Sequence, residues 1–521
     1  MKALPERPHL DHLKKQAKAL LDGARHGDPE SLERLRVALP AVARLDHAAI
    51  AAMGRLRLHD AQSCVAREYG FDSWAQLKDY VELQAASADA ATQKRQWRRW
   101  AFGHGYQVAK PRLAERLLHA HPGLLADEPA LACAVGDVAT VRAAIAADSG
   151  WVNAPHADSG MPPLACASFS GMVVLPAYAP GIRACIDLLL EAGADPDARW
   201  IDPQFPDDPL SALYGAAGRN HDIAITQRLL AAGADPNDHE SLYHATEADD
   251  PALVRLLLEA GARVTGSNAL FRALDYERPE TLRLLLAHGG DPNETGPGGC
   301  PLLHAIRRRR STGIIGILLD AGADPSARGK QGVSAYRLAR SRGLDDIAER
   351  LLQAGAVADE RPGDAFLGAC ARADRTAVQA MLLARPDLIG KLSPGALRLL
   401  PEQAANGCDD AVRVMVEAGW PIDARGGDID GSALNWAVFR GDAALAAFLL
   451  AHGAHYDERH GYNDNVYGTL SFASIAETTP GGDWLGCARA LIEAGSPLPA
   501  ERYEFPEEIA AYFEELRHTP V

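Results

Sequence analysis

Short apolar runs that end in glycine recur along the chain. In Leu188–Pro196 three leucines are followed by Glu-Ala-Gly-Ala-Asp-Pro, and Leu318–Pro325 repeats the pattern with two leucines. Apolar residues three and four positions apart form one stripe along a helix. The glycine supplies the left-handed residue that ends such a helix, and Asp-Pro prevents its continuation. The pattern therefore predicts many short amphipathic helices, each followed by a tight turn.

The glycine of this pattern returns at a regular interval. It occurs at Gly193, Gly233, Gly261, Gly289, Gly322, Gly355, Gly419, Gly453 and Gly495. The successive differences are 40, 28, 28, 33, 33, 64, 34 and 42, and a degenerate copy at Met381–Pro386 divides the gap of 64 into 31 and 33. The underlying period of about 33 predicts a repeat protein, in which each unit buries its apolar face against its neighbours.

The residues around these leucine runs resemble the ankyrin repeat, whose inner helix carries Thr-Pro-Leu-His-x-Ala and whose outer helix carries Val-x-x-Leu-Leu-Leu. Copies of the two patterns are Cys300–Ala305, Asp430–Ala437, Ser241–Ala245, Pro163–Ala167 and, for the outer helix, Val254–Ala262. The resemblance covers residues 111–500. It implies an all-α ankyrin-repeat solenoid of roughly ten or eleven units with short β-hairpin fingers. It also implies that His304 makes hydrogen bonds between neighbouring units.

Departures from the period mark candidate functional loops. Insertions lengthen individual units at residues 171–180, 199–208 and 461–467. Insertions in repeat proteins lie on loops of one face, which is often the binding face.

The two ends of the chain lie outside the repeat. Residues 1–84 contain amphipathic stretches and resemble the helical N-terminal region of many bacterial ankyrin-repeat proteins, so we expect a small helical domain. Residues 85–110 are predicted to be a linker helix, with Trp97 and Trp100 packed on the first repeats. Residues 501–521 are acidic and are expected to cap the last repeat, with contact to a basic partner as the alternative.

The charge of the chain narrows the class of partner. The 521 residues carry a formal net charge of -16 at pH 7, which disfavours attraction to nucleic acid and to anionic membranes. The basic and aromatic residues of Lys94–Trp100 would suit nucleic acid, but packing of the two tryptophans in a core is the preferred interpretation. No stretch is long and apolar enough to predict a membrane span.

Cysteine and arginine usage indicate the setting. The eight cysteines have no paired spacing, so we expect them to be reduced in a cytoplasmic protein. Arginine far outnumbers lysine, which is typical of a GC-rich bacterial genome.

Arginines recur on the predicted inner helices. Stacked units should bring them together as a stripe along the concave side, and guanidinium groups suit carboxylates and phosphates. The predicted partner-binding residues are Arg272, Arg278, Arg307, Arg308, Arg309, Arg310, Arg337, Arg340, Arg342 and Arg372. The alternative is a solvated face whose arginines pair with local acids such as Asp275, Glu277, Asp345 and Asp374.

Other constellations are explained more simply by the repeat. His452–His460 holds three histidines and two carboxylates, but their spacing is not a tight metal motif. Asp428–Gly431 lacks the remaining ligands of a calcium loop. The chain carries no phosphate-binding loop, dinucleotide fingerprint or nucleophile elbow. We therefore expect no metal, no cofactor and no enzymatic activity.

The sequence thus predicts a non-enzymatic scaffold or adaptor that binds another protein, such as an acidic segment, through its concave groove and finger loops. One alternative is a secreted effector or an immunity-type inhibitor that also acts by protein binding. Another is an enzyme with a site in the insertions at residues 155–210 or 455–485.

Overall fold

The chain divides into two compact units. A computed structural model describes residues 2, 4–5, 8–39, 42–43, 45–52, 56, 58–71, 73–85, 89–103, 108–202, 206–296, 298–329, 332–476, 478–479, 481–500 and 502–518. The first unit comprises Met1–Gly103, Ala109–Asp127 and Glu504–Val521, and the second comprises His104–Val108 and Glu128–Tyr503.

The first unit is a helical domain. Its described helices are α1 (Leu10–Arg25), α2 (Pro29–Ala38), α3 (His47–Ala52), α4 (Leu58–Glu68), α5 (Trp74–Ala85), α6 (Ala90–Phe102), α7 (Pro111–Ala120) and α31 (Glu507–His518). Helix α1 packs on α2, α4 and α5, and its buried face includes Leu13 and Leu20. The amphipathic pattern near the N-terminus therefore does form a helical region.

This unit extends beyond the expected boundary at residue 84. Helix α6 packs on α7, and Trp97 and Trp100 are buried, with exposed fractions of 0% and 3%. The tryptophans were predicted to pack on the first repeats, and they are buried in the first unit, to which α7 also belongs. Helix α31 also lies in this unit, where it contacts α5 and buries Ile509 and Phe513. The C-terminal segment that was predicted to cap the last repeat thus contributes a helix to the first unit.

The second unit is a stack of helix pairs. Within the described residues there are eleven pairs, each consisting of an inner and an outer helix. They are α8 (Pro129–Val135) with α9 (Val138–Ala147), α10 (Pro163–Ser168) with α11 (Ala179–Glu191), α12 (Ala212–Tyr214) and the π-helical turn η3 (Gly215–Arg219) with α13 (Ile223–Ala231), α14 (Ser241–Ala245) with α15 (Ala252–Glu259), α16 (Ala269–Asp275) with α17 (Pro279–Ala287), α18 (Pro301–Arg307) with α19 (Thr312–Asp320), α20 (Ala335–Ser341) with α21 (Asp345–Gln353), α22 (Asp364–Ala371) with α23 (Arg375–Ala384), α24 (Pro394–Leu397) and α25 (Leu399–Ala405) with α26 (Asp409–Glu417), α27 (Ala433–Phe439) with α28 (Ala443–Ala451), and α29 (Val466–Ala476) with α30 (Trp484–Glu493). Short 3-10 turns are η1 (Ser149–Asn153), η2 (Gly171–Val174) and η4 (Ile389–Lys391).

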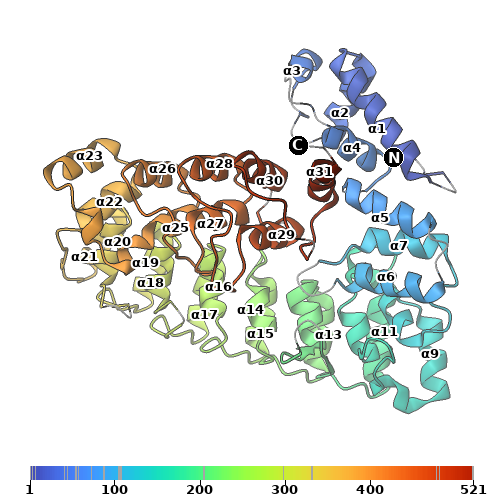
Figure 1. Ribbon diagram of the computed structural model, residues 1–521. Helices are drawn as coiled ribbons and strands as arrows, with labels where there is room; N and C mark the ends of the chain where they lie inside the picture. Colours follow the sequence, from blue (N-terminus) through green and yellow to red (C-terminus); the bar gives the residue numbers. More distant parts are fainter. Residues whose placement is uncertain are drawn as a thin grey trace. The chain divides into compact units, whose positions relative to one another are not determined.

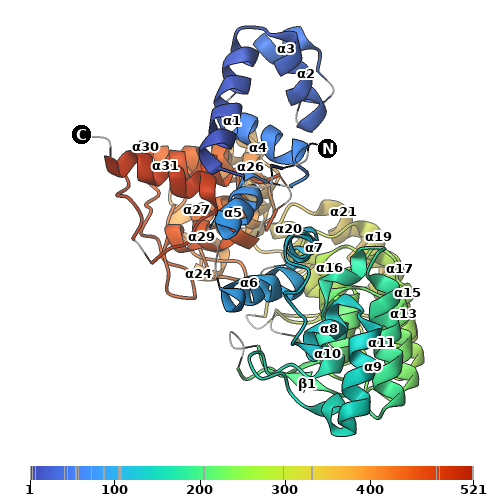
Figure 2. The ribbon, with the colours of Figure 1, turned by 90° about the vertical axis from the view of Figure 1, so that its right-hand side faces the viewer.

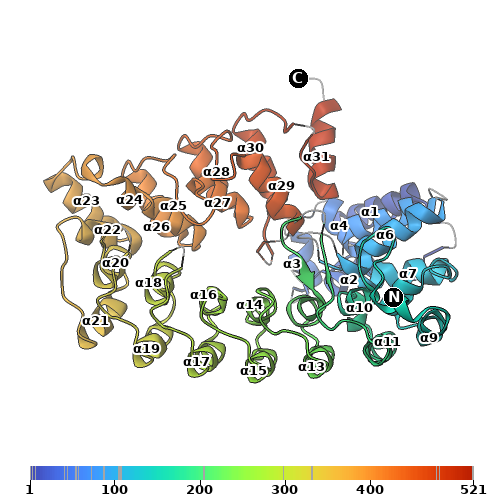
Figure 3. The ribbon, with the colours of Figure 1, turned by 90° about the horizontal axis from the view of Figure 1, so that it is seen from below.

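Figure 2 shows the outer helices α9 to α17 side by side, and Figure 3 shows the inner helices as a second row beside them. The degenerate copy predicted at Met381–Pro386 includes the last turn of α23 with its leucine run, so a helix pair does occupy the long gap. Every described helix falls short of the length and hydropathy that a membrane-spanning segment needs.

The recurring glycine and the residues after it join one pair to the next. Gly322 has a φ of 93°, a left-handed conformation that glycine adopts without strain. The following Ala323 is buried at 4% exposure. From the previous finger, the Asn293 side chain donates to the carbonyl oxygen of Gly322 at 2.9 Å and accepts from the backbone N–H of Asp324 at 2.8 Å. Asn153 makes the equivalent two bonds to Gly193 and Asp195, which are 40 and 42 residues later, so successive units are tied in series.

The finger that contains the insertion at residues 199–208 holds the paired strands of the described residues. Strands β1 (Arg199–Trp200) and β2 (Leu210–Ser211) are antiparallel, with Arg199 opposite Ser211. The Trp200 ring packs against Phe169 at a centroid distance of 5.6 Å, which anchors this finger on the preceding inner helix. Other described fingers contain only isolated bridges, such as the one between Gly426 and Gly431.

The stack reverses direction after α22 and α23 (Figure 1). We call α8 to α21 the first arm and α24 to α30 the second arm. Near the turn the outer helices α23 and α26 border a cleft of about 510 Å³ that includes Val378, Leu382 and Val414. Contacts between the arms join the ends of inner helices, such as α18 and α25. The chain therefore places residues that are up to 120 positions apart within hydrogen-bond distance.

Candidate functional site

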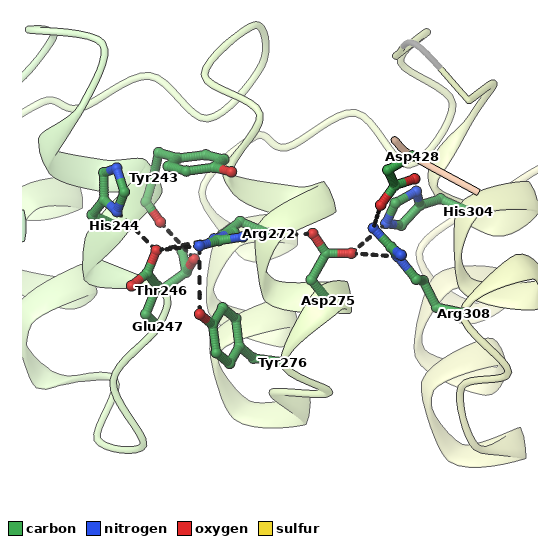
Figure 4. A network of polar contacts seen from close by, with 10 residues as sticks. All are labelled: Tyr243, His244, Thr246, Glu247, Arg272, Asp275, Tyr276, His304, Arg308 and Asp428. Atoms are coloured by element: carbon green, nitrogen blue, oxygen red, sulfur yellow. Dashed lines mark hydrogen bonds and ion pairs between the residues drawn. The ribbon is translucent and has the colours of Figure 1, made fainter. Parts of the chain in front are cut away.

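Two consecutive inner helices place an arginine between two tyrosines. Tyr243 lies on α14, Arg272 lies on α16, and Tyr276 directly follows α16. The Arg272 guanidinium carbon is 5.0 Å from the centroid of the Tyr243 ring and 4.9 Å from that of Tyr276. Figure 4 shows these three side chains at the centre of a network of polar contacts. We call Tyr243, Arg272 and Tyr276 the tyrosine–arginine stack. Each cation–π contact of this kind contributes about 0.5–1 kcal/mol at partly exposed sites.

Glu247 fixes the position of Arg272. Its Oε1 accepts hydrogen bonds from Nε and Nη2 of Arg272 at 3.0 and 2.6 Å, and lies 2.8 Å from Nδ1 of His244. Burial acts to raise the pKa of Glu247, but the hydrogen bonds with His244 and Arg272 outweigh it and lower that pKa. Burial acts to lower the pKa of His244, but its contacts with Glu240 and Glu247 raise it. These charge-assisted bonds hold Arg272 in place before any partner arrives.

Asp275 forms the next junction of the network. Its Oδ1 lies 2.8 Å from Nε2 of His304 and accepts from Nε of Arg308 at 2.7 Å. Because Asp275 lies on α16 and His304 on α18, the histidine does link neighbouring units. Burial acts to raise the pKa of Asp275, but the contacts with His304 and Arg308 lower it. Nη2 of Arg308 also reaches Asp428 of the second arm at 2.6 Å (Figure 4).

The tyrosine–arginine stack is open to solvent. Tyr276 is 41% exposed, which is unusual for a large aromatic residue, and the Arg272 side chain is 26% exposed. Tyrosine and arginine are among the residue types most enriched at interface hot spots. The stack is therefore an aromatic and cationic surface that is already held in place and partly accessible to solvent.

Most of the predicted arginines are neutralised within the chain. Eight of the ten pair with carboxylates, namely Arg272 with Glu247, Arg278 with Asp249, Arg308 with Asp275 and Asp428, Arg310 with Glu277, Arg337 with Asp364, Arg340 with Asp345 and Glu360, Arg342 with Glu402, and Arg372 with Asp345. The alternative of pairing with local acids thus applies to Asp275, Glu277 and Asp345. Asp374 instead caps α23 by accepting from the backbone N–H of Ala377.

Three of these arginines differ from the rest. Arg337 is buried at 9% exposure and makes two bonds to Asp364, of 2.7 and 3.0 Å, which corrects the expectation that it faces a partner. Arg307 and Arg309 make no ion pair among the described residues. Arg307 donates to the carbonyl oxygen of Gly298, and Arg309 donates to that of Arg342.

The histidine and aspartate clusters have structural roles. Nδ1 of His455 and of His460 lies 3.2 Å from the backbone N–H two residues later. Asp428 pairs with Arg308, and Asp430 pairs with Arg398 and Arg425. In the part of the chain that the structure describes, no three His, Cys, Asp or Glu side chains are grouped as a metal site.

Sequence reasoning missed Tyr243, Tyr276 and Glu247. Attention to charge selected arginines and passed over the aromatic residues beside them. The sequence does hold a signal for this site. Tyr243 lies on one inner helix with the acid Glu247 four residues later, and Arg272 lies on the next with Tyr276 four residues later.

Part of the chain is similar to known ankyrin-repeat sequences and structures. Residues 213–296 match the family model described as ankyrin repeats in three copies. The crystal structure of the human ASB11 ankyrin repeat domain is 22% identical over 44% of this chain and 97% of that one, with a TM-score of 0.34. The crystal structure of the ankyrin repeat domain of Bcl-3, described as a unique member of the IkappaB protein family, is 25% identical over 39% of this chain and 90% of that one, with a TM-score of 0.32.

Proposed function

We propose that this ankyrin-repeat protein is a non-enzymatic scaffold that binds another protein through the inner-helix face of its first arm. The observation that carries the proposal is the tyrosine–arginine stack, in which Arg272 lies between Tyr243 and the exposed Tyr276. Ankyrin repeats typically mediate protein binding. The stack supplies a defined centre for that activity.

The geometry lowers the cost of binding. Glu247 already occupies Nε and Nη2 of Arg272, so little side-chain freedom is left to lose when a partner docks. The exposed Tyr276 ring offers a flat apolar surface with a hydroxyl at its edge. We therefore expect the partner to present an apolar or aromatic side chain flanked by hydrogen-bond acceptors.

Charge pairing changes the expected kind of partner. An acidic segment would have to compete with Glu247 for Arg272, and with Asp275 and Asp428 for Arg308. Neutralised cations exert little long-range attraction, so we expect the affinity to depend weakly on salt.

The test is affinity capture of partners on the full chain, followed by titration with each partner found. Tyr276→Ala and Arg272→Ala should each weaken binding at least about tenfold, the range of an interface hot spot. Tyr462→Ala is the matched control, because Tyr462 is a 79% exposed tyrosine in a finger of the second arm. Equal affinity of the wild type and both stack variants would refute this face as the binding site.

Cell location and biological role belong to the same proposal. All eight cysteines are free thiols and six of them are buried. Burial raises the pKa of Cys185 to about 12, so this thiol is unreactive. These features support a reducing cytoplasm, in keeping with the bacterial amino-acid usage. An effector or immunity-type inhibitor would use the same face, and the identity of the captured partner separates these roles.

A second candidate function rests on one observation in the insertion region. His156 Nε2 lies 3.0 Å from Oε2 of Glu128, and His156 Nδ1 lies 3.0 Å from Oγ of Ser159. A carboxylate, an imidazole and a hydroxyl in this order can activate a serine nucleophile. Incubation with a fluorophosphonate probe tests it: labelling that is lost in Ser159→Ala would support a hydrolase, and no labelling would leave the three side chains a structural tie.

A further inference from the structure

The two arms bring arginines from three segments together. Arg307 ends α18, Arg342 follows α20, and Arg398 lies between α24 and α25. Asn406, at the end of α25, donates from Nδ2 to the carbonyl oxygen of Arg307 at 3.3 Å. One turn earlier on the same helix, Glu402 pairs with Arg342. These contacts fix α25 against the ends of α18 and α20.

Positive charge exceeds negative charge at this place. Glu402 is engaged by Arg342, and Asp430 by Arg398 at 2.7 Å and by Arg425 at 3.1 Å. Arg307 has no carboxylate partner among the described residues. Two carboxylates, Glu402 and Asp430, therefore face three guanidinium groups, and Asp430 is shared further with Arg425. We call Arg307, Arg342 and Arg398 the arginine cluster.

Arg307 is the member that lacks compensation. Burial lowers the pKa of its guanidinium, and the nearby charges of Arg342 and Arg398 lower it further against the opposing effect of Glu402. Its only hydrogen bond among the described residues goes to the carbonyl oxygen of Gly298. A partly desolvated cation beside like charges is costly unless an anion offsets it.

Two glycines lie beside the guanidinium of Arg307. A Cβ on Gly298 would lie 3.0 Å from Nη1 of Arg307, and a Cβ on Gly329 would lie 3.4 Å from Nη2. Two successive fingers thus place a glycine at the guanidinium edges, where a Cβ at Gly298 would be in tight contact and one at Gly329 in ordinary van der Waals contact. The Arg398 side chain is 39% exposed, so the cluster can be reached from solvent.

We propose that the arginine cluster is a binding site for a phosphoryl group, free or carried on a peptide. A phosphoryl group carries about -1.5 to -2 charges at neutral pH and three strong acceptor oxygens, which suit several guanidinium forks around a cation that has no carboxylate partner among the described residues. A carboxylate would supply half that charge and only two oxygens, and Glu402 already fills that role. The proposal is independent of partner binding at the tyrosine–arginine stack.

Calorimetric titration of the full chain with inorganic phosphate, against sodium chloride of equal ionic strength, tests the site. Arg307→Gln should weaken phosphate binding about tenfold, the loss expected on removing one charge-assisted contact. Arg283→Gln is the matched control, since Arg283 pairs with Glu280 on the outer helix α17, and it should bind phosphate like the wild type. No phosphate binding beyond the chloride baseline, or equal affinity in Arg307→Gln, would overturn the proposal.

A second variant, Glu402→Gln, should strengthen phosphate binding where Arg307→Gln weakens it. Glu402→Gln removes the competing carboxylate and frees Arg342, so phosphate affinity should rise severalfold. A merely structural role of Glu402 would not produce tighter binding. Glu402→Gln also tests the site if Arg307→Gln does not fold. Unchanged or weaker phosphate binding by Glu402→Gln would contradict the site.

The source of the phosphoryl group is distinguished in the same assay. A glycine-flanked phosphoserine peptide and its unphosphorylated form replace inorganic phosphate. Tighter binding of the phosphopeptide than of phosphate, lost in Arg307→Gln, assigns a peptide-borne group. Phosphate binding without phosphopeptide binding assigns a free anion, and equal binding of both peptides contradicts phosphoryl recognition.

Discussion

The arginines of the inner helices are neutralised in two different ways. Between adjacent repeats, an acid about one repeat away supplies the partner: Arg272 and Glu247 are 25 positions apart, and Arg337 and Asp364 are 27 positions apart. Between the arms the separations are 60 positions for Arg342 with Glu402 and 120 for Arg308 with Asp428. The first kind of pairing follows from stacking. The second kind depends on the reversal of the chain after α23.

The two kinds of pairing also differ in charge balance. Adjacent repeats match Arg272 with Glu247 and Asp275, and Arg278 with Asp249, and the same face carries the tyrosine–arginine stack. At the meeting of the arms the cations outnumber the acids. Neutral surfaces suit recognition by shape and aromatic contact, whereas uncompensated cations suit an anion. The comparison therefore separates two binding chemistries within one unit.

The largest expected effect tests pairing between adjacent repeats. Asp364→Ala leaves the buried Arg337 without its two bonds, and breaking a buried pair on one side costs about 3–5 kcal/mol. Urea denaturation followed by circular dichroism measures this loss. Glu280→Ala, which breaks an exposed pair on α17, is the control and should change stability little. A loss in Asp364→Ala no greater than in the control would show that this pairing is not stabilising.

A smaller effect is expected where the arms begin to diverge. A Cβ on Gly368 would lie 2.5 Å from the carbonyl oxygen of Arg340, so α20 and α22 must separate in Gly368→Ala. Overpacking of this kind costs about 1–3 kcal/mol. Gly363→Ala is the matched control in the same repeat, because a Cβ there meets nothing within 4 Å. Hydrogen exchange should rise in α20 and α22 of Gly368→Ala only, and equal exchange in both variants would contradict the close approach.

The pair across the arms should contribute less to global stability. The Asp428 side chain is 66% exposed, and exposed pairs contribute about 0–1 kcal/mol. Asp428→Asn should nevertheless raise hydrogen exchange of residues 426–431, because it releases this finger from Arg308. Asp457→Asn, which removes an exposed pair of the same arm, should leave that segment unchanged. Unaltered exchange in Asp428→Asn would mean that the arms are held by other contacts.

The smallest expected effect is on the pH dependence of stability, through the contacts of His244 with Glu240 and Glu247. The raised pKa of His244 means that the folded state binds this proton more tightly than the unfolded state, whose value is near 6.5. Its contribution is complete below pH 6.5 and is lost as pH rises through the raised folded pKa. His244→Gln should therefore have a lower free energy of unfolding than the wild type, measured by denaturation, at about pH 6. At about pH 8 this difference should be smaller, by less than about 1 kcal/mol. A difference that grows with pH would contradict the contacts with Glu240 and Glu247.

Much of the fold was predictable from the sequence because it is local. The leucine runs, the glycine that follows them and the period of about 33 specify helix pairs, turns and the unit hidden at Met381–Pro386. Finger asparagines such as Asn293 act on the next unit, so they repeat with the period as well. Even the contact of His304 with Asp275 is of this kind, because adjacent repeats fix both residues.

Only the tertiary structure decided which charges meet and which helices end in which unit. No short pattern marks α31 as part of the helical unit or marks Glu402 and Asp428 as partners of Arg342 and Arg308. Each repeat adds a small rotation to the stack, and contacts between distant repeats depend on the sum of these rotations. The chain by itself therefore determined the units and the arginines they carry. The reversal between the arms determined which of those arginines, Arg307 above all, has no acid as a partner among the described residues.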